Sequence, residues 1–220
     1  MQEQTVAVIL SGCGALDGSE IHEATLTLLA LDRAEIHYQC LAPNISQTRV
    51  SNMLTEETMT GFRRNVLKES ARIARGKILD LSKANPTDYA AVIFPGGYGA
   101  ALNLSNFGLD QENYTVQTDV SLFFKEAIIK THKPAGFICI SPVLVPKLYD
   151  SGVKITIGED RKIAAILEKM GAQHIQCLAT ECVTDKIHKV VSTPAYMLAH
   201  SIKEVAVGIE CLVKELIALL

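Results

Sequence analysis

The sequence has few aromatic residues and no excess of positive charge. Tryptophan is absent and aromatic residues make up 5% of the 220 residues, which weighs against a base-stacking surface or an aromatic cage. The 21 lysines and arginines are outnumbered by 24 aspartates and glutamates, so the net charge is −3. Proteins that bind nucleic acid use clustered basic residues to release counterions from phosphates. We therefore expect no nucleic-acid partner.

Long apolar runs are also missing. No run reaches the roughly 18 residues that cross a bilayer, and the N-terminus has no basic stretch followed by an apolar segment and a cleavage site. These absences predict no membrane partner and a cytoplasmic location. Apolar residues at 48% and charged residues at 20% form an ordinary globular balance, which excludes a disordered or collagen-like chain.

The cysteines lack the spacing of a metal site or a disulfide framework. Six are spread along the chain without a CxxC pair: Cys13, Cys40, Cys139, Cys177, Cys182 and Cys211. No HxH or HxxxH pair supplies histidine ligands for zinc. The pattern predicts reduced thiols, no metal and no organic cofactor.

The alternation of apolar runs with helical periodicities predicts an α/β fold. Strands are expected at 5–10, 36–41, 89–94, 135–140 and 154–157, with a further pair around 183 and 190–191. Helices are expected at 20–33, 65–76, 120–130, 161–170 and 195–219. We expect a single domain over residues 1–220 with a mostly parallel sheet and helices on both faces. The polar stretch at about 46–76 interrupts the alternation and is predicted to be an insertion.

Cys139 is the strongest candidate for a reactive side chain. It ends a predicted strand, with Gly136 before it and Ser141 and Pro142 after it, and a helix is expected to begin at Pro142. This arrangement resembles a nucleophile elbow, in which a sharp turn lifts the side chain above the sheet. The N-terminus of that helix would favour a thiolate and lower the cysteine pKa. The alternative is that Cys139 fills space in a buried strand, and position alone leaves both open.

Two other segments are expected at the same edge of the sheet. Gly96 and Gly97 follow a buried strand and can present backbone N–H groups to a developing oxyanion, or simply form a tight turn. Glu20 and Glu23 lie three residues apart at a helix start, where acids usually complement the helix dipole. One of them can instead enter the site protonated, bond the Cys139 thiolate and carry a proton.

Several strings of residues match a known pattern along nearly the whole chain. They are ILSGCG at 9–14, DGSEIHE at 17–23, RNVL at 64–67, SARIARGKI at 70–78, FPGGYGA at 94–100, NLS at 103–105 and TPAYM at 193–197. Together they resemble the ElbB family of the deglycase/PfpI superfamily, which has the class I glutamine amidotransferase-like fold. The resemblance implies a flavodoxin-like three-layer sandwich.

The resemblance also implies roles for the candidate residues. Cys139 is implied as the nucleophile, and Glu23 as the acid that bonds its sulfur. Backbone N–H groups near Gly97 and Ile140, with Gly96 beside them, are implied as an oxyanion and substrate site. The implied activity is a glyoxalase that turns glyoxal into glycolate without glutathione, and the family is associated with isoprenoid production in bacteria. The absence of a histidine that some deglycases use predicts low efficiency.

The sequence departs from neighbouring families at several positions. Ile140 stands where intracellular proteases of the superfamily have a histidine directly after the nucleophile. Residues 188–190 do not supply the late His-x-Glu pair of glutamine amidotransferases. Peptidase and glutaminase activities are therefore disfavoured. No histidine occurs around 158–159, where some deglycases use one, so Cys139 and Glu23 are expected to work as a dyad.

The leading hypothesis is a cysteine-dependent glyoxalase acting on small α-oxoaldehydes. An alternative is a non-enzymatic redox-sensing or regulatory protein, in which Cys139 is oxidised to a sulfenic or sulfinic acid. A third possibility is a small-molecule carrier that uses the insertion around Asn65 and Glu69. The apolar C-terminal helix can pack on its own sheet or on a partner, and we expect a homodimer.

Overall fold

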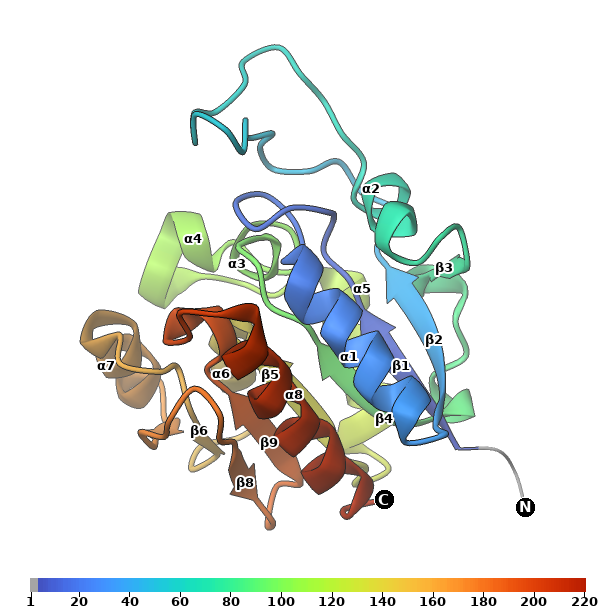
Figure 1. Ribbon diagram of the computed structural model, residues 1–220, viewed down its shortest axis with the longest axis vertical. Helices are drawn as coiled ribbons and strands as arrows, with labels where there is room; N and C mark the ends of the chain where they lie inside the picture. The colour runs from blue at the N-terminus through green and yellow to red at the C-terminus, as the bar shows by residue number, and fades with distance from the viewer. Residues whose placement is uncertain (1–3) are drawn as a thin grey trace.

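The computed structural model describes residues 4–220, with a seven-stranded sheet surrounded by helices (Figure 1). The strand order is β3-β2-β1-β4-β5-β9-β8, and all neighbours pair in parallel except β8 with β9. The strands are β1 (Thr5–Ile9), β2 (His37–Ala42), β3 (Ile78–Asp80), β4 (Tyr89–Phe94), β5 (Ala135–Ile138), β8 (Val183–Asp185) and β9 (Val190–Thr193). A separate pair joins β6 (Lys154–Ile155) to β7 (Gln173–His174). The predicted flavodoxin-like, mostly parallel α/β fold is confirmed.

Eight α-helices occur in the described part of the chain. They are α1 (Ile21–Arg33), α2 (Val66–Ile73), α3 (Gly99–Leu102), α4 (Phe107–Asp110), α5 (Thr118–Phe124), α6 (Val145–Leu148), α7 (Arg161–Lys169) and α8 (Ile202–Ile217). The long helices α1 and α8 lie side by side across the sheet (Figure 1). None of the helices in residues 4–220 is both long and apolar enough to span a membrane.

The central strand β1 is almost continuously apolar because it is buried on both faces. It pairs with β2 on one side and β4 on the other, and Val6 through Ile9 are fully buried. A parallel strand covered on both faces has no solvent-facing side, so apolar and polar residues do not alternate along it. The same layout brings the carboxyl ends of β1, β4 and β5 to one edge of the sheet.

The strand β5 ends two residues earlier than predicted because the chain turns at Cys139. Its φ of 61° lies in the left-handed region, which breaks the extended ladder. A 3-10 turn over Ser141–Leu144 follows, and α6 begins only at Val145. The helix expected from Pro142 is therefore replaced by a 3-10 turn and a single helical turn.

The C-terminal helix also begins later than its apolar pattern predicts. Ala195 has a φ of 44°, and residues Ala195–Met197 form a separate 3-10 turn. The Ser201 side chain then accepts the Glu204 N–H and caps α8, which starts the helix there. The 3-10 turn before the cap is held against α1, because the Tyr196 N–H donates to Glu23 Oε1.

The loop before α2 in the polar insertion at 46–76 extends beyond the carboxyl edge of the sheet (Figure 1), whereas α2 itself packs against β2 and β3. Hydrogen bonds tie the insertion to neighbouring loops: the Thr48 N–H donates to Asn103 Oδ1 at 3.0 Å, and the Ser51 N–H donates to Asp17 Oδ2 at 2.7 Å. Asn103 Nδ2 also donates to Asp17 O at 2.8 Å. The insertion is therefore anchored beside the loop that follows β1.

Candidate active site

Cys139 lies at a sharp turn directly after β5. Its side chain is 7% exposed, and its N–H donates to Thr193 O at 2.9 Å. Ser141 Oγ accepts the Ile138 N–H at 2.7 Å and donates to Phe94 O at 2.8 Å, so it ties the turn to β4. A left-handed non-glycine residue costs free energy and persists where its surroundings fix it. The sharp turn predicted for a nucleophile elbow is present at Cys139.

Glu23 reaches the same place from the first turn of α1. It is fully buried, and its Oε1 accepts the Tyr196 N–H at 3.1 Å. Its Oε2 is buried and has no hydrogen-bond partner of good geometry among residues 4–220. A Cβ added to Gly96 would stand 2.2 Å from this Oε2 and 2.4 Å from Cys139 Cβ. Oε2, Gly96 and Cys139 are therefore packed against one another.

Glu20 has a different position from Glu23, although both were candidates for the acid. Its Oε2 accepts the Glu23 N–H at 2.7 Å, so it caps α1. It remains partly exposed, whereas Glu23 is fully buried beside the sulfur. The geometry thus separates a capping acid from the acid that faces Cys139.

The backbone N–H groups of Gly97 and Ile140 lie near the Cys139 sulfur and lower the pKa of its thiol. Gly97 has a φ of 95°, and a Cβ there would stand 2.2 Å from Glu20 N. Only glycine fits both the left-handed conformation and this close approach. The two N–H groups are fixed donors of the kind that stabilises an oxyanion.

The acid and the thiol perturb each other's protonation. Burial raises the pKa of Glu23 to about 8, against the lowering effect of the Tyr196 N–H. Burial also raises the pKa of Cys139 well above its ordinary range, and the negative charge of Glu23 adds to this, while the N–H groups of Gly97 and Ile140 oppose it. The predicted lowering of the cysteine pKa is wrong, because the thiol is buried beside an acid and no long helix begins at the turn.

The Cys139 side chain opens into a cavity of about 410 Å³. Gly97, Cys139 and Ile140 line it together with the apolar residues Ala15, Leu16, Ile163 and Met197. Its polar lining also includes Glu20, Arg49, Tyr98 and Asp160. Arg49, Asp160 and Met197 were missed in the sequence because they come from three distant segments and share no spacing.

The histidines, Asn65 and Glu69 do not line this cavity. None of the six histidines lines it, and His22 Nδ1 bonds the Tyr196 hydroxyl at 2.8 Å in an exposed position. Asn65 caps α2 through the Lys68 N–H, and Glu69 pairs with Arg72. In residues 4–220 no group of three histidine, cysteine or acidic side chains could hold a metal ion.

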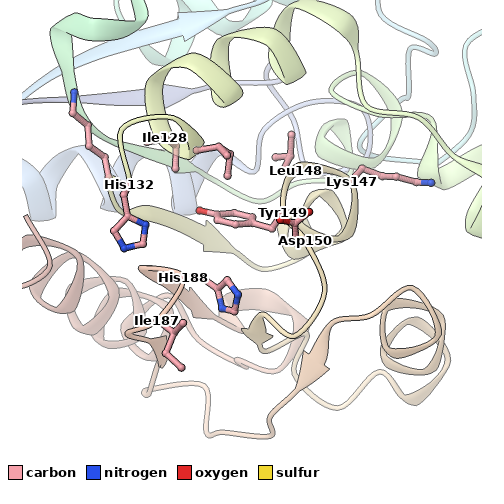
Figure 2. A pocket seen from close by; sticks show the side chains of 10 residues that line it. Ile128, His132, Lys147, Leu148, Tyr149, Asp150, Ile187 and His188 are labelled. Carbon is pink, nitrogen blue, oxygen red and sulfur yellow. The ribbon is translucent and has the colours of Figure 1, made fainter.

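A second cavity, of about 350 Å³, lies near the opposite end of β5 (Figure 2). Tyr149, His132 and His188 line it, and the buried Tyr149 hydroxyl has no partner among the described residues. His188 Nδ1 is held by Asp185 at 2.9 Å, while Lys147 points away from the cavity (Figure 2). Cys139, Glu23, Gly96, Gly97 and Ile140 do not line this cavity.

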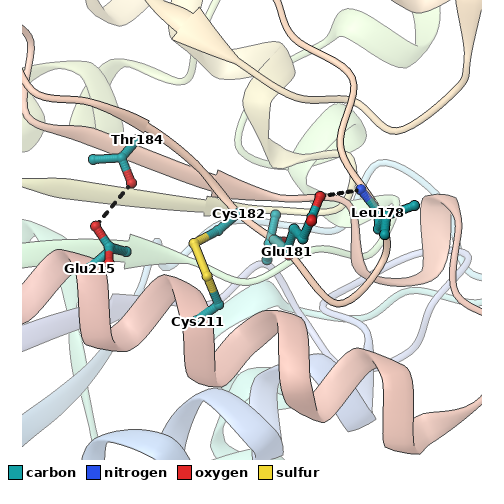
Figure 3. The surroundings of a disulfide bond; sticks show 7 residues. Leu178, Glu181, Cys182, Thr184, Cys211 and Glu215 are labelled. Carbon is teal, nitrogen blue, oxygen red and sulfur yellow. Dashed lines mark hydrogen bonds between the residues drawn. A yellow bond between two sulfur atoms is a disulfide. The ribbon is translucent and has the colours of Figure 1, made fainter.

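The cysteines are not all free thiols. A disulfide joins Cys182 to Cys211, with their Cα atoms 6.0 Å apart, and links the segment before β8 to α8 (Figure 3). Cys13, Cys40, Cys139 and Cys177 are free. The prediction of six reduced thiols is therefore wrong for this pair. The 29-residue separation of Cys182 and Cys211 in the sequence does not indicate a disulfide. The two residues come together only because α8 packs beside the segment before β8.

Comparisons with known proteins place the chain in a family. No family model matches. The human "Glutamine amidotransferase-like class 1 domain-containing protein 3, mitochondrial" is 39% identical over 223 residues, which cover 97% of this chain and 82% of that protein. The Rattus norvegicus "ES1 protein homolog, mitochondrial" is 39% identical, with 97% and 83% covered. Among solved structures, an isoprenoid biosynthesis protein with an amidotransferase-like domain from Ehrlichia chaffeensis superposes with a TM-score of 0.90 at 38% identity, over 98% of this chain and 100% of that one.

The chain belongs to the ElbB/ES1 family of class I glutamine amidotransferase-like proteins. The resemblance stated from the motifs is thereby confirmed. Glyoxalase III from Candida albicans shares the fold of this ElbB/ES1 protein with a TM-score of 0.64 at 15% identity, over 99% and 97% of the two chains. At that identity the likeness concerns the DJ-1/PfpI fold alone.

The comparisons correct one prediction, the cytoplasmic location. The human, rat and Danio rerio relatives are all named as mitochondrial proteins, and they point to a mitochondrial rather than a cytoplasmic location. Composition and the lack of an apolar N-terminal stretch carry no information that separates these two compartments. The prediction was wrong for that reason.

Proposed function

We propose that this ElbB/ES1 protein is a cysteine-dependent glyoxalase that adds water to α-oxoaldehydes and yields 2-hydroxy acids without a cofactor. One observation carries the proposal: a fully buried glutamate with its pKa raised to about 8 is packed against a cysteine at a left-handed turn. A carboxyl group that titrates near neutral pH can both give and take a proton. Isomerisation of an α-oxoaldehyde needs that property.

The first step forms a bond between Cys139 Sγ and the aldehyde carbon. The pair must first lose one of its two protons, which leaves one proton for the thiol and the Glu23 carboxyl to share. The sulfur then attacks, and the electrons of the carbonyl double bond move to the oxygen. The Gly97 and Ile140 N–H groups stabilise the oxyanion, and Glu23 delivers the remaining proton to it. The product of this step is a hemithioacetal.

The second step moves hydrogen between the two carbons. Glu23, now a carboxylate, takes the proton from the carbon bonded to sulfur, and the electrons of that C–H bond form a double bond to the neighbouring carbon. The carbonyl oxygen of the neighbouring carbon takes a proton from water, which gives an enediol. Glu23 then returns its proton to the second carbon, and the hydroxyl on the first carbon gives its proton back to water as the thioester carbonyl forms. The first carbon is oxidised to a thioester and the second is reduced to an alcohol, so no external oxidant or reductant is required.

Hydrolysis completes the reaction. Water attacks the thioester carbon, the carbon–sulfur bond breaks, and the thiol regains its proton. For glyoxal the balance is one glyoxal and one water to one glycolic acid. Cys139 is covalently bonded in every intermediate, which fits its position in the cavity wall.

The redox-sensing alternative is less well supported. Oxidation by peroxide requires a thiolate that solvent can reach. Cys139 is 7% exposed and its pKa is raised by burial, which disfavours oxidation as well as attack on an aldehyde. Only the aldehyde reaction makes use of a buried acid that titrates near neutral pH to move protons on the substrate. The carrier alternative loses its basis because Asn65 and Glu69 are engaged within their own helix.

Turnover of glyoxal by three proteins tests the proposal. Wild type is expected to form glycolate, Cys139→Ala none above buffer, and Glu23→Gln about 10²-fold to 10⁴-fold less than wild type, the usual contribution of a general acid or base. Cys40→Ala is the matched control, because Cys40 is also buried but lies within β2. Absence of wild-type turnover, or full activity of Cys139→Ala, would refute the glyoxalase.

A further inference from the structure

The Cys139 cavity has one basic residue among its lining residues, Arg49 from the insertion. Its Nη2 donates to Leu16 O at 3.0 Å, and its guanidinium carbon lies 5.2 Å from the centre of the Tyr98 ring. The hydrogen bond and the ring contact hold the planar group in one orientation. The cation is therefore positioned before any ligand arrives.

Arg49 keeps hydrogen-bond donors that the described chain does not use. Its Nε is buried and has no partner in residues 4–220. Its Nη1 makes no hydrogen bond to these residues and is not buried. A guanidinium has five N–H donors, and an unpaired buried donor is unfavourable. The Nη1 group, which is not buried, is the donor that an oxygen ligand in the cavity would meet.

The two acids of the cavity wall do not neutralise Arg49. Glu20 accepts the Glu23 N–H, and Asp160 accepts two N–H groups of the first turn of α7. Both therefore lie at helix N-termini, where the helix dipole compensates negative charge. Neither makes an ion pair with Arg49. The positive charge of Arg49 is available to a ligand.

The size and lining of the cavity indicate a substrate longer than glyoxal. Glyoxal has four non-hydrogen atoms and fills on the order of 60 Å³, the share of two water molecules. The cavity is about 410 Å³, and Leu16, Ile163 and Met197 give it an apolar middle. Pockets of this size usually enclose larger molecules.

We propose that Arg49 determines specificity, and that the preferred substrate is an α-oxoaldehyde whose carbon chain ends in a carboxylate. The aldehyde carbon meets Cys139 Sγ, the chain crosses the apolar middle, and the carboxylate binds the Arg49 guanidinium. Guanidinium and carboxylate form strong charge-assisted hydrogen bonds. The inference rests on the proposed glyoxalase function, and the reaction at the aldehyde is unchanged, so the product is a 2-hydroxy dicarboxylate.

The probe is 4,5-dioxopentanoate, compared with its methyl ester, which has the same reacting end and no charge. Wild type is expected to show a kcat/KM about tenfold higher for the acid, a difference of about 1.4 kcal/mol, mostly through KM. In Arg49→Met the ratio of kcat/KM for the acid to that for the ester is expected to fall close to one. In Arg49→Lys this ratio is expected to lie between those of wild type and Arg49→Met. Arg63→Met is the matched control, since Arg63 is exposed on the same insertion, and it is expected to keep the wild-type ratio.

Failure of this inference is distinguishable from failure of the glyoxalase. If glyoxal is turned over but acid and ester have equal kcat/KM in wild type, or Arg49→Met keeps the acid preference, the Arg49 inference is overturned and the glyoxalase stands. If no α-oxoaldehyde is turned over, calorimetry tests the role of Arg49 by measuring the binding of 2-hydroxypentanedioate to Cys139→Ser protein, with and without Arg49→Met. Binding to Cys139→Ser that is lost when Arg49→Met is added supports the carboxylate site. No binding to Cys139→Ser, or equal binding to both proteins, overturns it.

Discussion

At the scale of single residues, the chemistry depends on how many protons Cys139 and Glu23 share. Burial raises both pKa values, so the pair is neutral at low pH and holds two protons. Attack on an aldehyde needs the form with one proton. That form becomes populated as the pH rises through the Glu23 pKa of about 8.

The pH profile of kcat/KM follows from this proton count. We expect kcat/KM for glyoxal to rise with pH and to level off above about 8, because the pair loses its first proton there. Initial rates measured from about pH 6 to about pH 10 test this prediction. The residual activity of Glu23→Gln is expected to show no rise in kcat/KM near pH 8. A wild-type rate that falls steadily over this range would contradict the assignment of the acid.

Gly96 is expected to be required as glycine for steric reasons. A methyl group at this position would stand 2.2 Å from Glu23 Oε2 and 2.4 Å from Cys139 Cβ, closer than atoms can approach. Gly96→Ala should therefore separate the acid from the thiol and lower kcat by at least about tenfold. Gly76→Ala is the control: its φ of 80° makes the alanine costly for stability, but a Cβ there meets nothing within 4 Å and leaves the site untouched. Equal losses in both variants would count against the packed arrangement.

At the scale of elements, the sequence located strands well and turns poorly. The run at 89–94 is β4 as predicted, and Asn65 and Glu20 begin their helices by capping, since burial and capping leave local signals. A sharp turn was predicted at Cys139, but the strand before it was predicted two residues too long, and α8 was predicted to start too early. Both depend on left-handed residues, Cys139 and Ala195, whose conformations are imposed by tertiary contacts.

The disulfide is expected to stabilise the packing of α8 against the segment before β8. Replacement of Cys182 and Cys211 by alanine should lower the free energy of unfolding by about 2–4 kcal/mol, because the cross-link restricts the unfolded chain. Urea titrations of both proteins measure this difference. Cys177→Ala, which removes a free cysteine from the same region, serves as the control. An unchanged midpoint, together with two free thiols at 182 and 211 by mass spectrometry, would contradict the cross-link.

At the scale of the whole molecule, the parallel sheet explains why the candidate site could be predicted. The carboxyl ends of β4 and β5 lie beside each other, so Gly96, Gly97 and Cys139 meet even though about forty residues separate them. Glu23 comes with them because α1 starts at the same edge. Arg49 and Met197 could not be predicted, since their positions depend on loops without periodicity.

We propose that the protein is a homodimer, and the insertion suggests where the contact lies. Leu54 is 92% exposed and Phe62 is 63% exposed on this insertion, and a second copy of the chain would cover them. Light scattering is expected to give twice the monomer mass. Leu54→Asp with Phe62→Asp should convert the protein to a monomer, while Ile187→Asp, at another exposed site, should not. A monomeric wild type would refute the proposal.

The most direct test of the central claim is proton NMR of glyoxal incubated with the protein in D₂O. Proton transfer through Glu23 predicts glycolate that carries one deuterium on its alcohol carbon, formed by wild type and lost in Cys139→Ser. Glycolate that retains both original hydrogens would contradict transfer through an exchangeable carboxyl. A spectrum without glycolate beyond the buffer control would contradict the glyoxalase itself.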